Sequence, residues 1–491
     1  MSIFKDGLIR QGASVGTASP PYQIDQSIRF NDDDSAYLTR TQPTSTTTNK
    51  LFTISFWIKR NPGTNSIVYN GHLNGSNFNW LGFANDDTFF VQFYSGGNNI
   101  FVQTTNRKFR DPAAWYHIVY IYDSAEAFST ERTRLYVNGQ RETLVQYTSN
   151  TLYPSQNGSH YWIYTGVSNN IGLRASDNLR LDAYIAELAM FQDQEYGPEN
   201  FGEYNSSNIW IPKDGIADLN FGDSGFYIKG EDSSDLGNDS GTANGGAGYD
   251  FTASGLAAHD QMIDTPTNNF PTLTPLYGLF DLTLRDGNLD VQGSTATYRR
   301  TIGTQGVSTG KWYYEGYIVA TTVNNPGFGW VLTNPEDWTN YSLIGSGAHE
   351  VAGIFAATGQ THVGKAYVNG SLSSSYTSTT AAGDIFGIAV DFDNQGFYIH
   401  KNGTYYNSGD PTSGASKTGS LDASGMEAGA EYIPAASSQD TNSRAHLNFG
   451  QDGTFGGRTT AGGNTDGNGI GNFKYSVPSG YLALCTRNLG S

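Results

Sequence analysis

Apolar residues recur at every second position in short stretches along almost the whole chain. In LFTISFWIKR (51–60), Phe52, Ile54, Phe56 and Ile58 fall on one face, because successive side chains of a strand point to opposite sides. Similar stretches follow one another, separated by runs of Gly, Asn, Asp, Ser and Thr that are typical of turns. No long stretch has the 3.6-residue period of a helix. The pattern therefore predicts an all-β chain with at most a few helical turns.

Length and charge restrict the classes of protein that fit this pattern. The 491 residues exceed what a single sandwich core organises, so two or three domains are expected. The formal net charge of −18 argues against nucleic acid and against an anionic membrane surface as partners, because both would repel the chain. No apolar run approaches the roughly 18 residues that span a bilayer. The first 20 residues also lack the apolar core of a secretory signal.

The strand patterns of residues 26–212 predict an antiparallel β-sandwich. Their order resembles the laminin-G-like, or concanavalin-like, jelly-roll family. The segments that carry this resemblance are RFNDDDSAYL, FTISFWIKR, WYHIVYIYD, RLYVNGQ and YIAELAMFQ. The resemblance implies a jelly-roll domain over this range.

Composition changes on both sides of this block. Residues 213–280 include GEDSSDLGNDSGTANGGAGYDFTASG, which is poor in apolar residues and rich in Gly, Ser and Asp. Such a segment is expected to be a connector that buries little surface. Residues 1–25 are interpreted as an N-terminal attachment segment.

Residues 281–491 form a second β-rich block that resembles the SPRY family. Five motifs carry the resemblance in the expected order: GKWYYE, GFGWV, the hairpin GDIFGIAVDFDNQGFYIHKNG, NFG and PSGY. In the hairpin (383–403), Phe386, Ile388 and Val390 share one face, which predicts a half-buried strand, and Gly403 is expected to need a positive φ. The predicted fold class is thus all-β, with two antiparallel sandwiches, concanavalin-like and SPRY-like, joined by a Gly/Ser/Asp-rich connector.

Aromatic side chains beside polar ones are candidates for glycan recognition, because an aromatic ring stacks on the apolar face of a sugar. Trp80, Trp162, Tyr161 and Tyr164 stand in loop-like or strand-end contexts of the first block. In the second block, the resemblance to SPRY domains implies binding through loops at one end of the sandwich. The loop NPEDWTNYS (334–342) offers ring surface and hydrogen-bonding groups there: Trp338, Tyr341, Asp337 and Asn340.

Calcium is the one metal for which the sequence offers candidate ligands. Laminin-G-like domains often bind it, and Asp32, Asp33 and Asp34 offer hard oxygen ligands. Against this, the Ile-Asp-Glu strand common in the family reads Ile185-Ala186-Glu187 here, so one usual ligand is missing. No other cofactor is implied.

Catalytic signatures are absent from the sequence. It holds no Glu-x-Asp-x-x-Glu strand of a glycoside hydrolase and no zinc signature. We therefore expect a non-catalytic protein and assign no catalytic residue, although carboxylates from separate strands could still converge.

The tandem order of the two blocks resembles virion proteins of marine tailed bacteriophages. The segments that carry this resemblance are MSIFKDGLIR, QSIRFNDDDSAYL, FGEYNSSNIWIPKD, DTPTNNF and GYLALCTRNL. It implies an adhesin on the virion surface, either a tail fibre or a capsid-mounted appendage. The expected partners are other virion proteins and a host-surface glycan or receptor. We also expect a homo-oligomer, taken as a trimer, attached through residues near Ser2–Gln11. The alternatives are a structural decoration protein without a ligand and, third, a glycan-cleaving enzyme.

Overall fold

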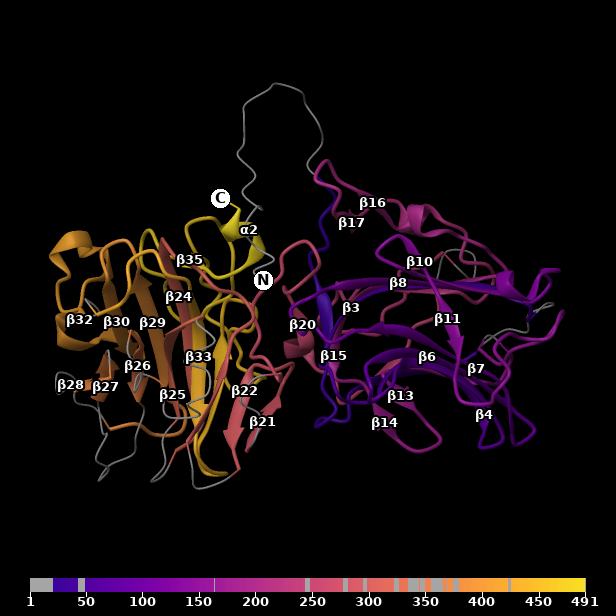
Figure 1. Ribbon diagram of the computed structural model, residues 1–491, viewed down its shortest axis with the longest axis horizontal. Coiled ribbons are helices and arrows are strands. Elements are labelled where there is room, and N and C mark those ends of the chain that lie inside the picture. Colours follow the sequence, from indigo (N-terminus) through magenta and orange to yellow (C-terminus); the bar gives the residue numbers. More distant parts are fainter. Residues whose placement is uncertain are drawn as a thin grey trace.

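Two β-sandwiches lie side by side in the computed structural model (Figure 1), with the first in indigo to magenta and the second in orange to yellow. The structure describes residues 21–42, 49–162, 164–242, 248–276, 281–294, 298–321, 326–333, 344, 349–354, 365–368, 370–373, 379–422 and 425–490. Within these residues the only α-helix is the four-residue α2 (Thr486–Leu489). The predicted all-β fold class is confirmed.

Over the part of the chain that the structure describes, the first sandwich consists of two sheets of eight strands each, with antiparallel pairing between all of these strands. One sheet contains β1 (Ser27–Phe30), β3 (Leu51–Arg60), β8 (Tyr116–Asp123), β9 (Thr133–Val137), β10 (Gln140–Glu142), β15 (Ala183–Gln192), β18 (Phe226–Ile228) and β20 (Gln261–Met262). The other contains β2 (Tyr37–Thr41), β4 (Ser66–Asn74), β5 (Asn77–Phe83), β6 (Thr88–Ser95), β7 (Asn98–Lys108), β11 (Leu144–Gln146), β12 (Ser168–Ile171) and β19 (Thr252–Ser254).

Among the described residues, the second sandwich consists of a nine-stranded and a six-stranded sheet. The larger contains β21 (Leu282–Arg285), β22 (Asp290–Gly293), β24 (Lys311–Ala320), β29 (Ile385–Asp391), β30 (Gly396–Lys401), β31 (Thr404–Tyr405), β32 (Leu421–Asp422), β34 (Arg444–Asn448) and β35 (Leu482–Ala483). The smaller contains β23 (Arg299–Ile302), β25 (Gly327–Leu332), β26 (Val351–Ile354), β27 (Lys365–Val368), β28 (Ser371–Ser373) and β33 (Tyr432–Ser438). Two short hairpins, β13–β14 (Leu173–Arg174 and Leu179–Arg180) and β16–β17 (Gly202–Tyr204 and Trp210–Pro212), belong to the first block. No helix among the described residues is long and apolar enough to cross a membrane.

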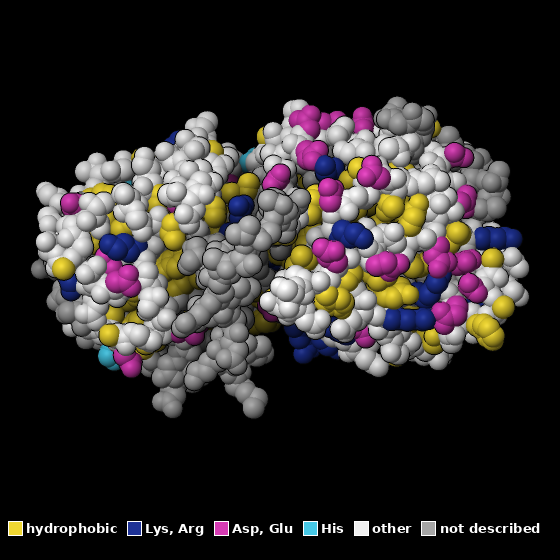
Figure 2. All heavy atoms as spheres, turned by 90° about the horizontal axis from the view of Figure 1, so that it is seen from above, with side chains coloured by type: hydrophobic (Ala, Val, Ile, Leu, Met, Phe, Trp, Pro, Cys, Tyr) yellow, Lys and Arg dark blue, Asp and Glu magenta, His cyan; other side chains and the backbone are white. Residues whose placement is uncertain are grey.

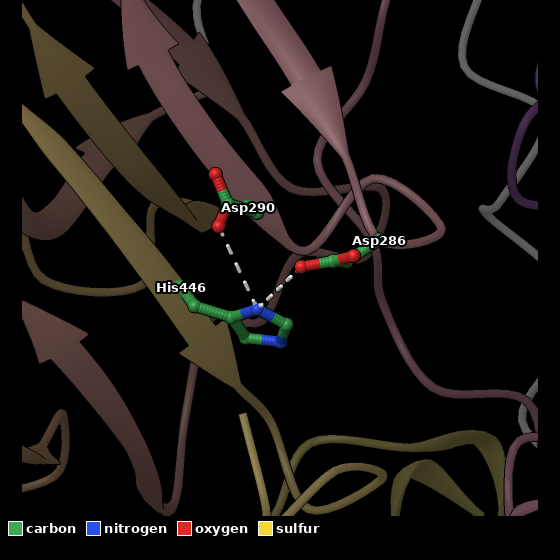
Figure 3. A group of neighbouring side chains, drawn as sticks. All are labelled: Asp286, Asp290 and His446. Atoms are coloured by element: carbon green, nitrogen blue, oxygen red, sulfur yellow. Dashed lines mark ion pairs between the residues drawn. The ribbon is translucent and has the colours of Figure 1, made fainter. Parts of the chain in front are cut away.

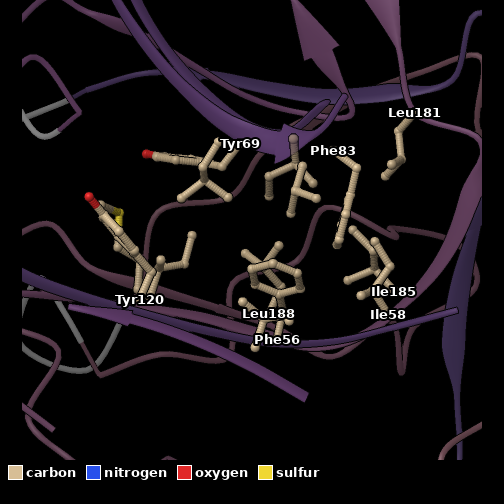
Figure 4. Close-up of a cluster of buried hydrophobic side chains, with 14 of the residues drawn as sticks. Phe56, Ile58, Tyr69, Phe83, Tyr120, Leu181, Ile185 and Leu188 are labelled. Atoms are coloured by element: carbon tan, nitrogen blue, oxygen red, sulfur yellow. The ribbon is translucent and has the colours of Figure 1, made fainter. Parts of the chain in front are cut away.

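The core of the first sandwich lies between its two sheets. Phe56, Ile58 and Ile185 point from one sheet toward Tyr69 and Phe83 of the other (Figure 4). These positions follow the period-two alternation, so strand periodicity places the apolar face inward. Each such side chain contributes about 1.5–3 kcal/mol when it is fully buried.

The stretch expected to be a connector is instead packed against both sandwiches over its described residues. Its strands β18, β19 and β20 pair with β15, β2 and β1 of the first sandwich. Phe226 and Phe251 belong to the first core, whereas Met262 and Leu273 belong to the second. The expectation of little buried surface was wrong, because the few apolar residues in this stretch occupy core positions.

A buried polar boundary joins the two sandwiches, and we call it the seam. Arg29 on β1 forms ion pairs with Asp260 (3.2 Å) and with Asp452 of the second block (2.8 Å). Tyr184 donates its hydroxyl to the carbonyl of Gly287 at 2.9 Å. Gly287 has φ +63° and a Cβ there would lie 2.1 Å from the Tyr184 hydroxyl, so this close approach requires glycine.

The hairpin of residues 383–403 is buried on both sides, not half-buried as expected. Phe386, Ile388 and Val390 on β29 face the core between the two sheets. On the opposite face, Ala389 packs in a separate cluster with Tyr481 of the C-terminal segment. That segment covers the face that would otherwise be exposed to solvent.

Charged side chains of opposite sign are interspersed on the face of the first sandwich that is seen from above (Figure 2). Many of the acidic groups in this sandwich have basic partners, such as Glu131 with Arg141 and Glu195 with Arg134. The net charge of −18 therefore does not appear as a single acidic patch on this face.

Candidate ligand-binding site

An aromatic-lined hollow opens at one edge of the first sandwich, with a volume of about 560 Å³. Strands β4, β6, β7 and β8 form one side, and the loop between β11 and β12 forms the other. We call this site the aromatic hollow, and its lining residues are Asn49, Leu73, Phe93, Ser95, Ile100, Phe101, Tyr122, Pro154, Ser155, Gly158, Ser159, His160, Tyr161 and Tyr164.

The loop that forms one side of the aromatic hollow is fixed by hydrogen bonds to the sheet. The carbonyl of Gly158 accepts hydrogen bonds from the hydroxyls of Tyr122 (2.9 Å) and Ser124 (2.7 Å). The amide of Gly158 in turn donates to the carbonyl of Ser155 at 3.0 Å, which closes a turn. The site is thus built on a rigid sheet with an anchored loop, an arrangement that suits recognition.

Two tyrosines form the accessible aromatic surface of the hollow. Tyr161 and Tyr164 pack edge to face, with ring centroids 6.3 Å apart. The Tyr161 hydroxyl is held by Ser95 (2.9 Å) and Asn77 (3.1 Å), whereas the Tyr164 side chain is 46% exposed. Tyr164 therefore offers ring surface to a ligand, and Tyr161 holds a fixed polar group beside it.

No Asp or Glu is among the described residues that line the hollow. Its one titratable imidazole, His160, is buried, and burial lowers the pKa of His160 to about 3. The imidazole is neutral at ordinary pH and packs edge-on against Tyr122. The hollow can thus offer stacking and hydrogen bonds, but its described lining lacks the carboxyl pair used to cleave a glycosidic bond.

The two first-block tryptophans predicted to bind a ligand are part of the packed interior. Trp162 is completely buried and makes edge-to-face contacts with Phe52 and Phe93. Trp80 is 4% exposed, stacks on Phe90 at 4.7 Å and has the guanidinium of Arg174 4.8 Å over its ring. Neither ring is accessible to a ligand, so this part of the prediction was wrong.

The other predicted binding residues lie outside the described residues. These are Asp337, Trp338, Asn340 and Tyr341 in the loop 334–342. Their role stays a prediction.

The predicted calcium ligands do not form a shared set. Asp33 forms an ion pair with Arg285 at 2.8 Å, and Asp34 accepts a hydrogen bond from the Asn31 side chain at 2.8 Å. Asp32 is exposed, and its backbone carbonyl accepts the Ser35 amide in a turn. The three carboxylates do not come together as a group of possible ligand atoms, so a three-aspartate calcium cage does not fit this turn.

One buried group in the described chain has the composition of a metal centre: Asp286, Asp290 and His446 (Figure 3). The Nδ1 atom of His446 lies 3.3 Å from Asp286 and 3.9 Å from Asp290. Arg458, however, contacts the same two carboxylates at 2.9 and 3.0 Å.

This arrangement is an ion-pair network. Burial opposes ionisation of Asp286, but the hydrogen bond with His446 and the charges of Arg29 and Arg458 hold its pKa below the usual range. Because guanidinium groups already neutralise the carboxylates, a metal ion would have to displace Arg458. The geometry therefore fits an ion-pair network better than a metal centre.

A second aromatic hollow, of about 610 Å³, lies where the β16–β17 hairpin meets the first sandwich. Three of its aromatic residues already use their polar atoms in hydrogen bonds, whereas the buried Nε1 of Trp57 has no partner among the described residues. Trp210 contacts His117 at 3.1 Å, Tyr204 donates to the carbonyl of Asn138 at 3.0 Å, and Trp115 donates to Asp264 at 3.2 Å. These rings hold the hairpin and the seam in place, so the aromatic hollow at the sheet edge is the better ligand site.

Sequence reasoning identified the two tyrosines of the aromatic hollow but not its other walls. Leu73 and Ile100 come from strand ends and are 39% and 43% exposed. Ser155 and Ser159 come from the segment YPSQNGSHY, where small and polar residues surround aromatic ones. That local composition was the feature of the sequence that could have indicated these wall residues.

Comparisons with known proteins bear on the first block. Residues 31–194 match the model of the Concanavalin A-like lectin/glucanases superfamily. No curated protein matches the chain. Similar solved structures, each 14% identical to this chain, include the SPRY domain of human HERC1. The match to that domain covers 36% of this chain and 96% of the HERC1 domain, with a TM-score of 0.26.

Two further examples are a native heptameric SAP-like pentraxin from Limulus polyphemus and the TRIM65 PSpry domain. The pentraxin match covers 39% of this chain and 93% of that chain with a TM-score of 0.28, and the TRIM65 match covers 36% and 90% with a TM-score of 0.26. The aromatic hollow is built by strands and a loop that lie within the residues matched to the superfamily. Residues 31–194 therefore form a concanavalin A-like lectin-fold domain.

Proposed function

We propose that this protein is a non-catalytic glycan-binding protein that binds its ligand in the aromatic hollow. The observation that carries the proposal is the half-exposed ring of Tyr164 beside the hydrogen-bonded hydroxyl of Tyr161, in a lectin-fold domain. A pyranose presents an apolar C–H face for stacking and hydroxyls for hydrogen bonds. The absence of Asp and Glu from the described lining supports binding without cleavage.

The resemblance to virion proteins supports a further part of the proposal, namely that the binding protein is an appendage on the surface of a bacteriophage particle. Adhesion to a host surface suits weak single sites that act together, because linked sites bind more tightly than one site alone. Other virion proteins would be its partners in that setting.

A glycan array probed with the full chain tests the binding site. Tyr164→Ala should weaken binding by about tenfold or more while leaving the fold intact, because the side chain is half-exposed. Tyr147→Ala is the matched control, since Tyr147 is 43% exposed and lies outside the hollow.

Trp338→Ala is tested in parallel, because its loop is the site predicted from sequence alone. Loss of binding in Trp338→Ala with unchanged binding in Tyr164→Ala would move the site to the second block. Failure of the wild-type chain to bind any glycan would overturn the proposed function.

A further inference from the structure

One lysine of the first sandwich is buried against an amide and a carboxylate of the stretch that leads to the second sandwich. The Nζ atom of Lys59, on β3, lies 2.8 Å from Asp264 Oδ2 and 2.8 Å from Asn269 Oδ1. It also donates to the carbonyl of Phe270 at 2.7 Å. Lys59 is 2% exposed, and among the lysines whose burial the structure describes it alone is buried. Proximity and fixed orientation make two weakly reactive groups into reaction partners.

The carboxyl group of Asp264 is fixed so that one of its oxygens faces the amine. The indole nitrogen of Trp115 donates to Asp264 Oδ1 at 3.2 Å, and the backbone amide of Phe270 donates to the same atom at 3.3 Å. The other oxygen, Oδ2, contacts Lys59. The amine lies over the ring of Tyr184, 5.8 Å from its centroid, and Asp264 is completely buried. Water is therefore kept away from the amine and the carboxyl group.

The carboxamide of Asn269 is held at both its nitrogen and its oxygen. Its Nδ2 donates to the carbonyl of Ala113 at 2.7 Å, and its Oδ1 accepts from Lys59. The backbone amide of Asn269 donates to Thr486 Oγ1 at 2.9 Å. Asn269 also lines the second aromatic hollow. A small molecule released from this side chain would enter the hollow and not the packed interior.

Burial favours the uncharged forms of both ionisable groups. It lowers the pKa of Lys59 and raises the pKa of Asp264, in each case against the opposing charge of the other group. Both shifts favour transfer of a proton from Lys59 Nζ to Asp264 Oδ2, which leaves a neutral amine and a neutral acid. The neutral amine of a buried lysine is a nucleophile, whereas an ammonium group is not.

We propose that Lys59 and Asn269 form an intramolecular isopeptide bond, with Asp264 as the general acid and base. Lys59 Nζ attacks Cγ of Asn269, the Nζ–Cγ bond forms, and an electron pair of the carbonyl moves to Oδ1. Asp264 gives its proton to Nδ2 and takes one from Nζ. The electron pair then returns from Oδ1, the Cγ–Nδ2 bond breaks, and ammonia leaves. An amine and a carboxamide thus give a secondary amide and ammonia, and the balance needs no other reactant.

The bond would tie the first sandwich to the chain that enters the second. Lys59 and Asn269 are 210 positions apart, and Leu273, which follows shortly after Asn269, belongs to the second core. A covalent link that closes so long a loop restricts the unfolded chain, as a disulfide does. With Cys485 as its single cysteine, the chain cannot form an internal disulfide, whereas its composition allows an isopeptide cross-link.

Intact-mass spectrometry of the purified full chain tests this proposal. Beyond any removal of Met1, the wild type should be lighter than its sequence by one molecule of ammonia. A protease digest should contain one branched peptide that joins the segments of Lys59 and Asn269. Lys59→Arg and Asn269→Ala should each keep the mass of their sequence. Asn269→Ala keeps the proposal testable if Lys59→Arg fails to fold, because Asn269 is only partly buried. Asp264→Asn should leave most of the chain unlinked.

Lys50→Arg is the matched control, because Lys50 Nζ also contacts an asparagine oxygen, Asn157 Oδ1 at 3.2 Å, but at an exposed position. This variant should keep the loss of ammonia. A wild type with the full mass of its sequence would overturn the proposal. So would a loss of ammonia that persists in Lys59→Arg, since asparagine in an Asn-Gly turn loses ammonia when it closes to a succinimide. A loss of water with a Lys59–Asp264 peptide would overturn the assignment of Asn269 as the acceptor, and a fully linked Asp264→Asn would overturn the role of Asp264.

Discussion

Gly403 occupies a backbone conformation that other residues resist. It follows Asn402 in the turn between β30 and β31, and the two residues have φ values of +86° and +50°. A Cβ at Gly403 would also lie 3.0 Å from the ring of Tyr475. Gly403→Val should therefore lower the free energy of unfolding by about 1 kcal/mol or more. Gly75→Val is the control, because Gly75 has open space around it and is not in the positive-φ region. Equal denaturation midpoints for the two variants would contradict this account.

Glu315 makes a pH-dependent contribution to the stability of the second sandwich. Its carboxyl group is buried, and burial raises the pKa of Glu315 to about 7 although it accepts hydrogen bonds from the amides of Lys474 and Tyr475. The folded state thus holds a proton that the unfolded chain releases near its ordinary pKa of 4.5. This contribution to stability is present below that value and is lost as the pH rises through about 7.

The comparison of wild type with Glu315→Gln isolates the contribution of Glu315 to stability, because other groups titrate alike in both proteins. The stability advantage of the wild type over Glu315→Gln should shrink between about pH 5 and about pH 8. Thermal unfolding over this range measures it. A stability advantage of the wild type that grows with pH would contradict this account. It would mean that the hydrogen bonds affect the pKa of Glu315 more than burial does, and that Glu315 is ionised in the folded state.

Residue types alone did not separate exposed aromatic side chains from core aromatic side chains. Trp162 and Tyr164 are two positions apart in the sequence, yet Trp162 is buried and Tyr164 is 46% exposed. The difference arises because Phe52 and Phe93, which come from other strands, enclose Trp162. Local sequence identified the tyrosines of the hollow, but the contacts that removed Trp162 from the site are long-range.

At the scale of strands, the alternating pattern predicted the position of a strand correctly, whereas composition did not predict which stretches are packed into a sandwich. The predicted strand 51–60 coincides with β3, since its periodicity is unbroken. The stretch 213–280 contains too few apolar residues to show a period, yet β18, β19 and β20 pair with strands that come much earlier in the chain. Such pairing depends on partners that a local reading cannot provide.

Phe226 on β18 tests whether this stretch belongs to the first core. It is fully buried and packs against Tyr69 and Phe251, with ring centroids 5.6 and 5.0 Å away. Phe226→Ala should lower the free energy of unfolding by about 3–5 kcal/mol through the cavity it leaves. Phe128→Ala is the control, because Phe128 is 75% exposed. Chemical denaturation that gives the same small effect for both variants would restore the interpretation of this stretch as a connector.

At the scale of the whole molecule, the two sandwiches are joined by buried charges and hydrogen bonds. Sequence could predict two β-rich blocks, because each has its own run of strand motifs. It could not predict the seam, because residues such as Arg29 and Asp452 lie far apart in the chain and each is unremarkable in its local context. Because these contacts are buried, we expect the stability of one sandwich to depend on the other.

Arg29 is the residue through which this dependence can be measured. Its guanidinium is buried and contacts Asp260 and Asp452, and its charge is the main factor that holds the pKa of Asp452 low against the opposing effect of burial. Arg29→Ala would leave both carboxylates buried without this partner, which should cost about 3–5 kcal/mol.

Hydrogen exchange on the full chain should then show faster opening on both sides of the seam, around β1 and around Asp452. Arg141→Ala is the matched control, because it removes an exposed ion pair with Glu131 whose contribution is about 0–1 kcal/mol. Faster exchange confined to the first sandwich would show that the two sandwiches open independently. An Arg29→Ala effect no larger than that of Arg141→Ala would show that the buried pair does not stabilise the seam.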